Sequence, residues 1–100
     1  MTNFERALQL LGLARRAGKL VTGESFVLAA VRDHTARLVF LASDAGKSSQ
    51  KQFRDKTASY DVPLNESFTK DQLSTAIGSA RTVIAITDPG FVRKLQQLLE

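Results

Sequence analysis

The sequence predicts an α/β fold, a three-layer α/β/α sandwich built on a small mixed four-stranded sheet. Residues 36–42 and 82–87 are apolar, include β-branched residues and show no polar alternation, which is typical of strands covered by helices on both faces. Segments with helical periodicity alternate with extended segments along the chain, and this order favours helices on both sides of one sheet. With 100 residues, 43% of them apolar, we expect one domain spanning residues 1–100.

We expect nine elements, with helices and extended segments in strict alternation. In order, they are a helix over 3–17, an extended piece over 19–21, a helix from 22 to about 33, a strand over 36–42, a helix over 46–59, an extended piece over 62–64, a short helix after 69, a strand over 82–87 and a helix from 89.

Capping signals delimit the first two helices. Thr2 and Glu5 form a capping box at the start of the first helix, and Gly18 stands where a helix can end in the left-handed region. Thr22 and Gly23 open the second helix. The side chains that we expect on the buried faces are Phe4, Ala7, Leu8, Leu11 and Ala14 in the first helix and Val27, Ala30 and Val31 in the second.

The middle of the chain runs from the central strand to a sheet edge. The central strand is followed by Ser43 and Asp44, which are good N-caps for the polar helix over 46–59. This helix has mainly Phe53 as apolar content, so we expect it on the surface. Pro63 cannot donate a ladder hydrogen bond, which places the extended piece around it at a sheet edge or a strand end.

The last part of the chain has its own capping signals. Thr69 and Gln72 form a second capping box, and Gly78 marks the end of that short helix. Asp88 supplies an N-cap and Pro89 a first-turn proline for the last helix. The residues that we expect to face inward in these two helices are Leu73, Ala76, Ile77, Val92, Leu95 and Leu99.

The composition excludes several classes of protein. The chain has no cysteine and a single histidine, His34, so it lacks a disulfide framework, a thiolate metal site and a histidine-based triad. We expect no metal and no cofactor, and we interpret His34 as a surface residue at a helix end. The longest apolar run, 38–42, is far shorter than the roughly 18 residues of a membrane span, and Glu5 and Arg6 stand where a signal peptide is apolar. We therefore expect a cytoplasmic protein with no membrane partner.

Two groups of basic residues stand out against a modest net charge of +4. Between Glu5 and Glu24 the chain carries four cations and no acid. The second group is spaced i, i+4, i+7 in the helix over 46–59, so its members share one helical face. Such stripes fit a phosphate backbone, and they also suit a solvated face; charge alone leaves both open. The first group is Arg6, Arg15, Arg16 and Lys19, and the second is Lys47, Lys51 and Arg54.

A short glycine motif after the central strand looks like the end of a phosphate-binding P-loop. Gly46-Lys47-Ser48 follows a strand and opens a helix, but Leu41 stands where the first glycine of that motif would be. We therefore interpret Gly46 as part of a loop and Lys47 as part of the basic stripe.

The start of the second helix has the means to bind an anion or a base edge. Gly23 lets the backbone approach a ligand closely, and the free N–H groups of the first turn form a donor set beside Ser25. The alternative is structural, with Thr22 as an N-cap, Gly23 in a tight turn and Glu24 as a favourable first-turn acid. The local sequence leaves both interpretations open.

The element order and four segments carry a resemblance to a known family. The segments are 11–23 (LGLARRAGKLVTG), 36–44 (ARLVFLASD), 73–78 (LSTAIG) and 83–88 (VIAITD). Together they resemble the L-seven-Ae ribosomal-protein family of kink-turn RNA binders, and within it the bacterial YlxQ group, over nearly the whole chain. The resemblance implies an α/β/α sandwich that binds RNA, with no catalysis and no cofactor.

The resemblance also implies which parts of the chain meet RNA. The family's RNA surface corresponds here to residues 22–29, 43–50 and 78–82. The candidate RNA-binding residues are Lys19, Thr22, Gly23, Glu24, Ser25, Lys47, Lys70, Ala80 and Arg81.

The same resemblance implies individual roles. Gly23 and Ser25 would face sheared base pairs, Lys70 the RNA backbone, and Ala80 with Arg81 the flipped nucleotide and nearby phosphates. The second-helix motif of the family is usually Gly-x-Asn-Glu-x-x-Lys. In this chain the Asn, Glu and Lys of that motif are replaced by Ser25, Phe26 and Ala29.

Our leading hypothesis is a non-enzymatic, monomeric RNA-binding protein that recognises ribosomal or other structured, kink-turn-like RNA. Proteins of the ribosome or of another ribonucleoprotein are further candidate partners. One alternative is a protein-interaction module on the same fold with weakened RNA recognition. Another is a small phosphate-handling enzyme, since Asp44 and Asp88 each follow a strand, where an open α/β sheet places catalytic carboxylates; both also suit N-caps.

Overall fold

The computed structural model describes all of residues 1–100, and its elements follow the predicted order. They are α1 (Asn3–Arg16), β1 (Leu20–Thr22), α2 (Glu24–Arg32), β2 (Leu38–Leu41), α3 (Lys47–Ser59), β3 (Leu64–Asn65), α4 (Lys70–Ile77), β4 (Val83–Ile86) and α5 (Pro89–Leu99). The two central strands are one or two residues shorter at each end than expected.

The sheet has four strands in the order β1-β4-β2-β3. It is mixed, as predicted: β4 runs antiparallel to both β1 and β2, whereas β3 pairs parallel with β2. Pro63 immediately precedes the edge strand β3, and its carbonyl accepts a hydrogen bond from the Val39 N–H at 2.9 Å. The expected position of this proline at a sheet edge is therefore confirmed.

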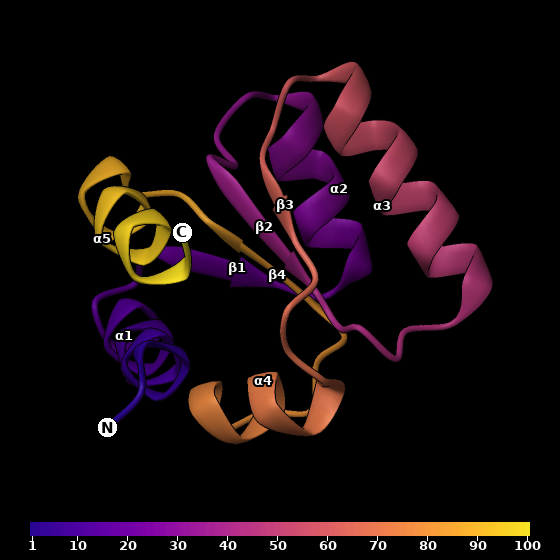
Figure 1. The fold of residues 1–100 in the computed structure, drawn as a ribbon. Coiled ribbons are helices and arrows are strands. Elements are labelled where there is room, and N and C mark those ends of the chain that lie inside the picture. The colour runs from indigo at the N-terminus through magenta and orange to yellow at the C-terminus, as the bar shows by residue number, and fades with distance from the viewer.

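Helices cover both faces of the sheet, which confirms the three-layer sandwich. In Figure 1, α2 and α3 lie to the right of the strands, whereas α1 and α5 lie to the left and α4 below. β2 and β4 are buried along their whole length because alternate side chains enter opposite cores. Phe40 and Ile84 pack with α1, α4 and α5, and Val39 and Ala85 pack with α2 and α3.

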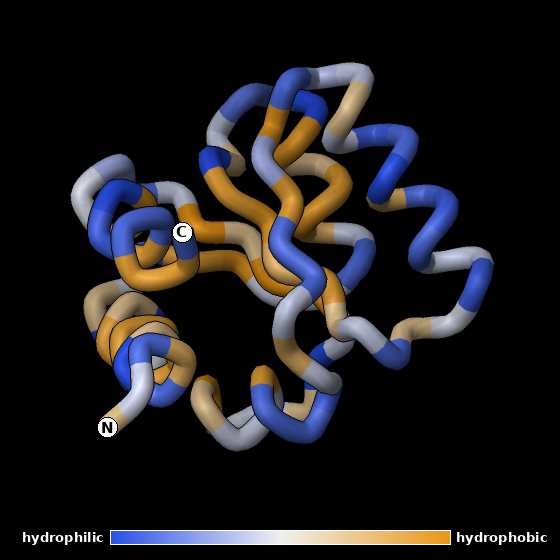
Figure 2. The backbone as a smooth tube through the Cα atoms, in the orientation of Figure 1, coloured by the Kyte–Doolittle hydropathy of each residue, from blue (hydrophilic) through white to orange (hydrophobic).

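The third helix lies on the surface, as its polar sequence predicts. Figure 2 shows α3 as largely hydrophilic, in contrast to the hydrophobic strands beside it. Its two buried residues are Phe53 and Thr57, and the Thr57 hydroxyl donates to the Phe53 carbonyl at 2.6 Å. Burial of the Phe53 ring contributes about 1.5–3 kcal/mol to the attachment of this helix.

Two expected helix caps were wrong. Thr22 is the last residue of β1, and Gly23 is the N-cap of α2 with a φ of +92°, a conformation that a residue with a Cβ rarely adopts. Ser43 and Asp44 do not cap α3, whose N-cap is Gly46. The Asp44 Oδ1 instead accepts a hydrogen bond from the Lys70 N–H at 2.9 Å, where its negative charge also complements the dipole of α4.

Phe4 departs from the expected buried face of α1. Its side chain is 54% exposed, and its ring packs edge-on against Phe68 at a centroid distance of 5.6 Å. Phe68 fills the core at this place, so Phe4 covers it from outside. None of the five helices combines the length and the apolar character that crossing a bilayer requires.

Strand direction brings three loops to one end of the sheet. Thr22 at the end of β1 pairs with Ile84, and Leu41 at the end of β2 pairs with Val83 at the start of β4. The loops around residues 22–24, 42–46 and 78–82 therefore meet there, and α2, α3 and α4 begin there. We call this end of the sheet the Gly23 end.

Candidate functional site

Eight of the nine candidate residues lie at the Gly23 end. Thr22, Gly23, Glu24 and Ser25 occupy the turn from β1 into α2, Lys47 and Lys70 are the first residues of α3 and α4, and Ala80 and Arg81 precede β4. Lys19 lies at the opposite end of β1, where its carbonyl accepts hydrogen bonds from the N–H and hydroxyl of Thr87 at 3.0 and 3.1 Å. The structure therefore does not bring Lys19 together with the others.

Arg81 ties the loop before β4 to the end of β1. Its Nε donates to the Thr22 Oγ1 at 3.1 Å, and its Nη1 donates to the Ala80 carbonyl at 2.7 Å. Its backbone N–H donates to the Ser74 Oγ at 3.0 Å, which anchors the loop to α4 independently of the side chain. A guanidinium has five N–H donors, so three remain available in an exposed position with no acidic partner.

The two helices that cover one face of the sheet, α2 and α3, begin without a side-chain cap. Gly23 and Gly46 offer no acceptor to the first-turn N–H groups of α2 and α3, whereas Thr2, Thr69 and Asp88 cap the other three helices. The free N–H groups and the helix dipoles give these two starts partial positive charge.

The two uncapped starts are linked to each other. The Ser49 hydroxyl in the first turn of α3 donates to the Glu24 Oε1 in the first turn of α2 at 3.0 Å. Gly23 is also fixed by its N–H, which donates to the Val83 carbonyl at 3.2 Å. The two donor sets are therefore held as one surface at the Gly23 end.

The basic stripe of α3 is largely paired with acids. Arg54 donates to both carboxylate oxygens of Glu66 at 2.9 and 3.1 Å, and these hydrogen bonds raise the pKa of Arg54. Lys51 lies 3.4 Å from Asp55. Only Lys47 of the stripe has no ionic partner. The solvated-face interpretation thus fits Arg54 and Lys51, and Lys47 joins Lys70 and Arg81 as the unpaired cations of the Gly23 end.

One supporting residue was not among the candidates. The Arg15 Nη1 donates to the Ile77 carbonyl and to the Ser79 Oγ, each at 2.9 Å, so α1 holds the end of α4 and the loop that follows it. The acid-free segment from 6 to 19 marked Arg15 as basic, but sequence spacing gives no sign of a partner more than sixty residues away.

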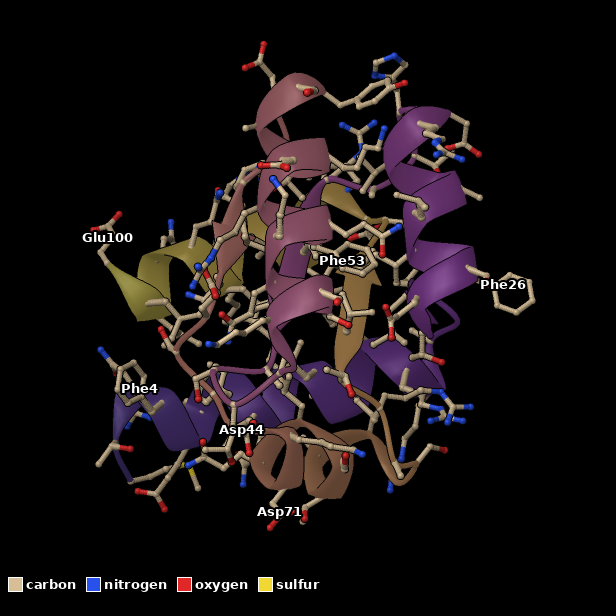
Figure 3. The ribbon with its side chains drawn as sticks, turned by 90° about the vertical axis from the view of Figure 1, so that its right-hand side faces the viewer. Phe4, Phe26, Asp44, Phe53, Asp71 and Glu100 are labelled. Atoms are coloured by element: carbon tan, nitrogen blue, oxygen red, sulfur yellow. The ribbon has the colours of Figure 1, made fainter.

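Phe26 is a second feature of the site that the sequence left unexplained. It lies in the first turn of α2 and is 73% exposed. Figure 3 shows its ring pointing away from the body of the protein.

The two carboxylates of the enzyme hypothesis lie far apart in the fold. Asp44 follows β2 and Asp88 follows β4, and because these strands are antiparallel the two residues are at opposite ends of the sheet. The Asp88 Oδ2 accepts the Phe91 N–H at 2.9 Å as the N-cap of α5. No three His, Cys, Asp or Glu residues lie close enough to hold a metal ion. The structural interpretation accounts for both aspartates.

Comparison with known proteins finds two similar proteins that carry the same name. The chain is 42% identical to the RNA-binding protein YlxQ of Enterococcus faecium over 98 residues, which is 98% of this chain and 95% of that protein. It is 44% identical to the RNA-binding protein YlxQ of Bacillus subtilis (strain 168) over 92 residues, 91% of this chain and 92% of that protein.

Solved structures share the fold. A protein of unknown function from Bacillus halodurans C superposes with a TM-score of 0.88 at 45% identity, over 93% of this chain and 95% of that one. The Giardia lamblia 15.5kD RNA binding protein superposes with a TM-score of 0.78 at 18% identity, over 92% and 80% of the two chains, a likeness of fold alone.

A family model confirms the resemblance that the sequence segments carry. The model described as the Ribosomal protein L7Ae/L30e/S12e/Gadd45 family matches residues 5–96, nearly the whole chain. The L-seven-Ae relationship, the YlxQ-like sequence and the α/β/α sandwich thus agree. The chain belongs to the Ribosomal protein L7Ae/L30e/S12e/Gadd45 family.

Proposed function

We propose that this protein binds structured RNA of the kink-turn type through the Gly23 end of its sheet, without catalysing a reaction. The observation that carries the proposal is the convergence there of three unpaired cations and two uncapped helix starts. Its family membership and the RNA-binding relatives named YlxQ support the same conclusion.

The unpaired cations and the uncapped helix starts have different roles in this binding. Lys47, Lys70 and Arg81 neutralise phosphates, which supplies most of the affinity and makes it depend on salt. The N–H groups at the start of α2 donate to acceptors on the RNA, with Gly23 and Ser25 toward the sheared base pairs. Ala80 and the remaining donors of Arg81 meet the flipped nucleotide and its phosphate.

The substitutions in the second-helix motif define the balance between affinity and base reading. Ser25 offers one hydroxyl where an Asn would offer both an acceptor and two donors, and Ala29 offers no charge where a Lys would bind phosphate. Recognition in this chain therefore depends more on RNA shape and phosphate position than on base edges. We place the protein in the cytoplasm as a monomer, with ribosomal or other ribonucleoprotein RNA as its partner.

Binding assays with three RNAs test the proposal. The protein, freed of nucleic acid, is titrated into a kink-turn RNA, a plain duplex of equal length and total ribosomal RNA. We expect the tightest binding to the kink-turn and salt-sensitive binding to all three. Equal affinity for kink-turn and duplex would contradict kink-turn recognition. No binding to any RNA at low salt would favour the protein-interaction module instead.

Purification provides a simple companion observation. The chain has one tyrosine and no tryptophan, so its own absorbance at 280 nm is very low. RNA that co-purifies would dominate the ultraviolet spectrum, and nuclease treatment at high salt would remove that signal.

A further inference from the structure

The Phe26 side chain is more exposed than any other large apolar side chain of the protein. At 73% exposure it exceeds Met1, Phe4 and Leu13. Phe4 at least packs its ring against Phe68, whereas Phe26 is paired with no other aromatic ring. Nothing in the fold uses it, because the buried face of α2 consists of Val27, Ala30 and Val31. A phenyl ring in water forgoes the stabilisation that burial of its carbon surface would give.

The ring projects from the same part of the surface as the candidate RNA contacts. Phe26 is three residues after Gly23, the N-cap of α2, and so lies in the first turn of that helix; Thr22, which accepts the Arg81 hydrogen bond, immediately precedes the cap and ends β1. The next turn on the same side carries Ala29, which is too small to cover the ring. The ring is therefore largely uncovered, on the helix turn that directly follows the Thr22 contact of Arg81 in the chain.

The chemistry of the ring limits what it can bind here. A phenyl group has no hydrogen-bonding atom, so it interacts through its π face or by apolar contact. The positive charge of Arg81, which is bonded to Thr22 just before α2, and the free N–H groups of the α2 start favour a polyanion over a neutral or basic protein surface. In RNA, the base that offers a free face is an unpaired one, since bases inside a helix are already stacked on both sides.

We propose that Phe26 is a stacking platform for an unpaired nucleobase of the RNA held at the Gly23 end. This inference rests on the proposed RNA-binding function and adds a requirement to it: the RNA presents an unstacked nucleotide next to the first turn of α2. Stacking is tolerant of sequence because every base has a π face. Phe26 thus supplies affinity for unpaired nucleotides without reading their identity.

The experiment compares three variants of one residue on two RNAs. Phe26→Trp introduces the only tryptophan of the chain and reports stacking through its fluorescence. Phe26→Leu keeps an apolar side chain without a ring, and Phe26→Ala removes both. The probes are a kink-turn RNA with unpaired nucleotides and a fully paired duplex of equal length.

We expect that affinity for the RNA with unpaired nucleotides depends on an aromatic ring at position 26. Phe26→Leu and Phe26→Ala weaken binding to the RNA with unpaired nucleotides by about 5- to 150-fold, the range for one base stacked on an aromatic side chain. Phe26→Trp keeps the affinity, and its emission is quenched on saturation with that RNA. None of the variants alters duplex binding. Phe4→Leu, at the other large exposed ring, is the matched control and leaves both affinities unchanged.

The outcomes separate this inference from the function on which it rests. If the wild-type protein binds the kink-turn and Phe26→Leu binds it equally well, or if the tryptophan emission does not change, the stacking proposal is overturned and RNA binding stands. If the wild-type protein binds neither RNA, both proposals are overturned. If the tryptophan emission shifts with protein concentration in the absence of RNA, the ring contacts a second copy of the chain and the stacking proposal is wrong.

Discussion

Removal of the Arg81 side chain separates the RNA-binding role of this residue from its structural role. The Arg81→Ala substitution removes the guanidinium, and with it the hydrogen bonds to the Thr22 hydroxyl and the Ala80 carbonyl. The backbone N–H of residue 81 still donates to Ser74, so the loop remains attached to α4. Exposed substitutions of this kind change stability by about 0.5 kcal/mol or less, which for a chain of this size limits the change in melting temperature to roughly 2–4 °C.

The expected loss of RNA affinity follows from the number of cations at the Gly23 end. Three unpaired cations, Lys47, Lys70 and Arg81, predict a slope of log K against log salt of roughly −2 to −3, since each neutralised phosphate contributes about 0.7 to 0.9. Arg81→Ala should flatten that slope by about 1. At ~0.1 M salt the same relation predicts a loss of affinity of about 5- to 8-fold.

Binding to a labelled kink-turn RNA is measured by fluorescence anisotropy across a range of salt concentrations, with thermal unfolding of each variant followed by circular dichroism. Arg93→Ala is the matched control, because Arg93 is an exposed cation without an ionic partner on α5, away from the Gly23 end. If Arg93→Ala lowers the affinity and flattens the slope as much as Arg81→Ala, only net charge matters and the site is misplaced.

Three further predictions test the surrounding structure. Arg15→Ala removes the donors to Ile77 and Ser79, so we expect weaker RNA binding and faster hydrogen exchange at the Arg81 N–H; unchanged exchange would contradict a supporting role. Gly12→Ala places a Cβ 2.9 Å from the backbone oxygen of Ala76, and we expect denaturant unfolding to show net destabilisation, because the overpacking cost of about 1–3 kcal/mol exceeds the roughly 1 kcal/mol that alanine gains in a helix; an unchanged midpoint would argue against this close approach of α1 and α4. Hydrogen bonds from the Thr35 hydroxyl and N–H lower the pKa of Asp33, so the stability they provide is present above the unfolded-state pKa and lost as pH falls through the lower folded-state pKa; Thr35→Val should raise the pKa of Asp33 in an NMR titration, and no change would remove Thr35 as its cause.

Local sequence signals predicted the order of the elements, because helix periodicity, capping boxes and apolar strands are properties of neighbouring residues. Thr2 with Glu5 and Thr69 with Gln72 form the capping boxes that the spacing indicates. Asp44 shows the limit of such signals. Its spacing suits a cap of α3, but the fold brings the start of α4, twenty-six residues away in sequence, within hydrogen-bonding distance.

The candidate site was predictable in part for the same reason. The positions at the Gly23 end came from the family resemblance, and strand direction explains why those separate segments meet. Which cations stay free could not be predicted. Arg54 and Lys47 are equivalent on the helical stripe, yet Glu66, which follows β3, pairs with Arg54 and leaves Lys47 unpaired. This distinction depends on a tertiary contact that helical spacing does not encode.

A net charge of only +4 is compatible with a surface for a polyanion, because most acids of this protein have structural partners. Glu5 and Asp88 take part in helix caps, Asp33 closes a turn with Thr35, and Glu66 pairs with Arg54. Glu24, Asp44 and Asp71 lie at the helix starts of the Gly23 end, where the dipoles offset part of their charge, and Glu24 and Asp44 each already accept a hydrogen bond. The unpaired cations and uncapped N–H groups are left facing outward together. The distribution of charge, and not its total, is therefore what suits this small protein to RNA.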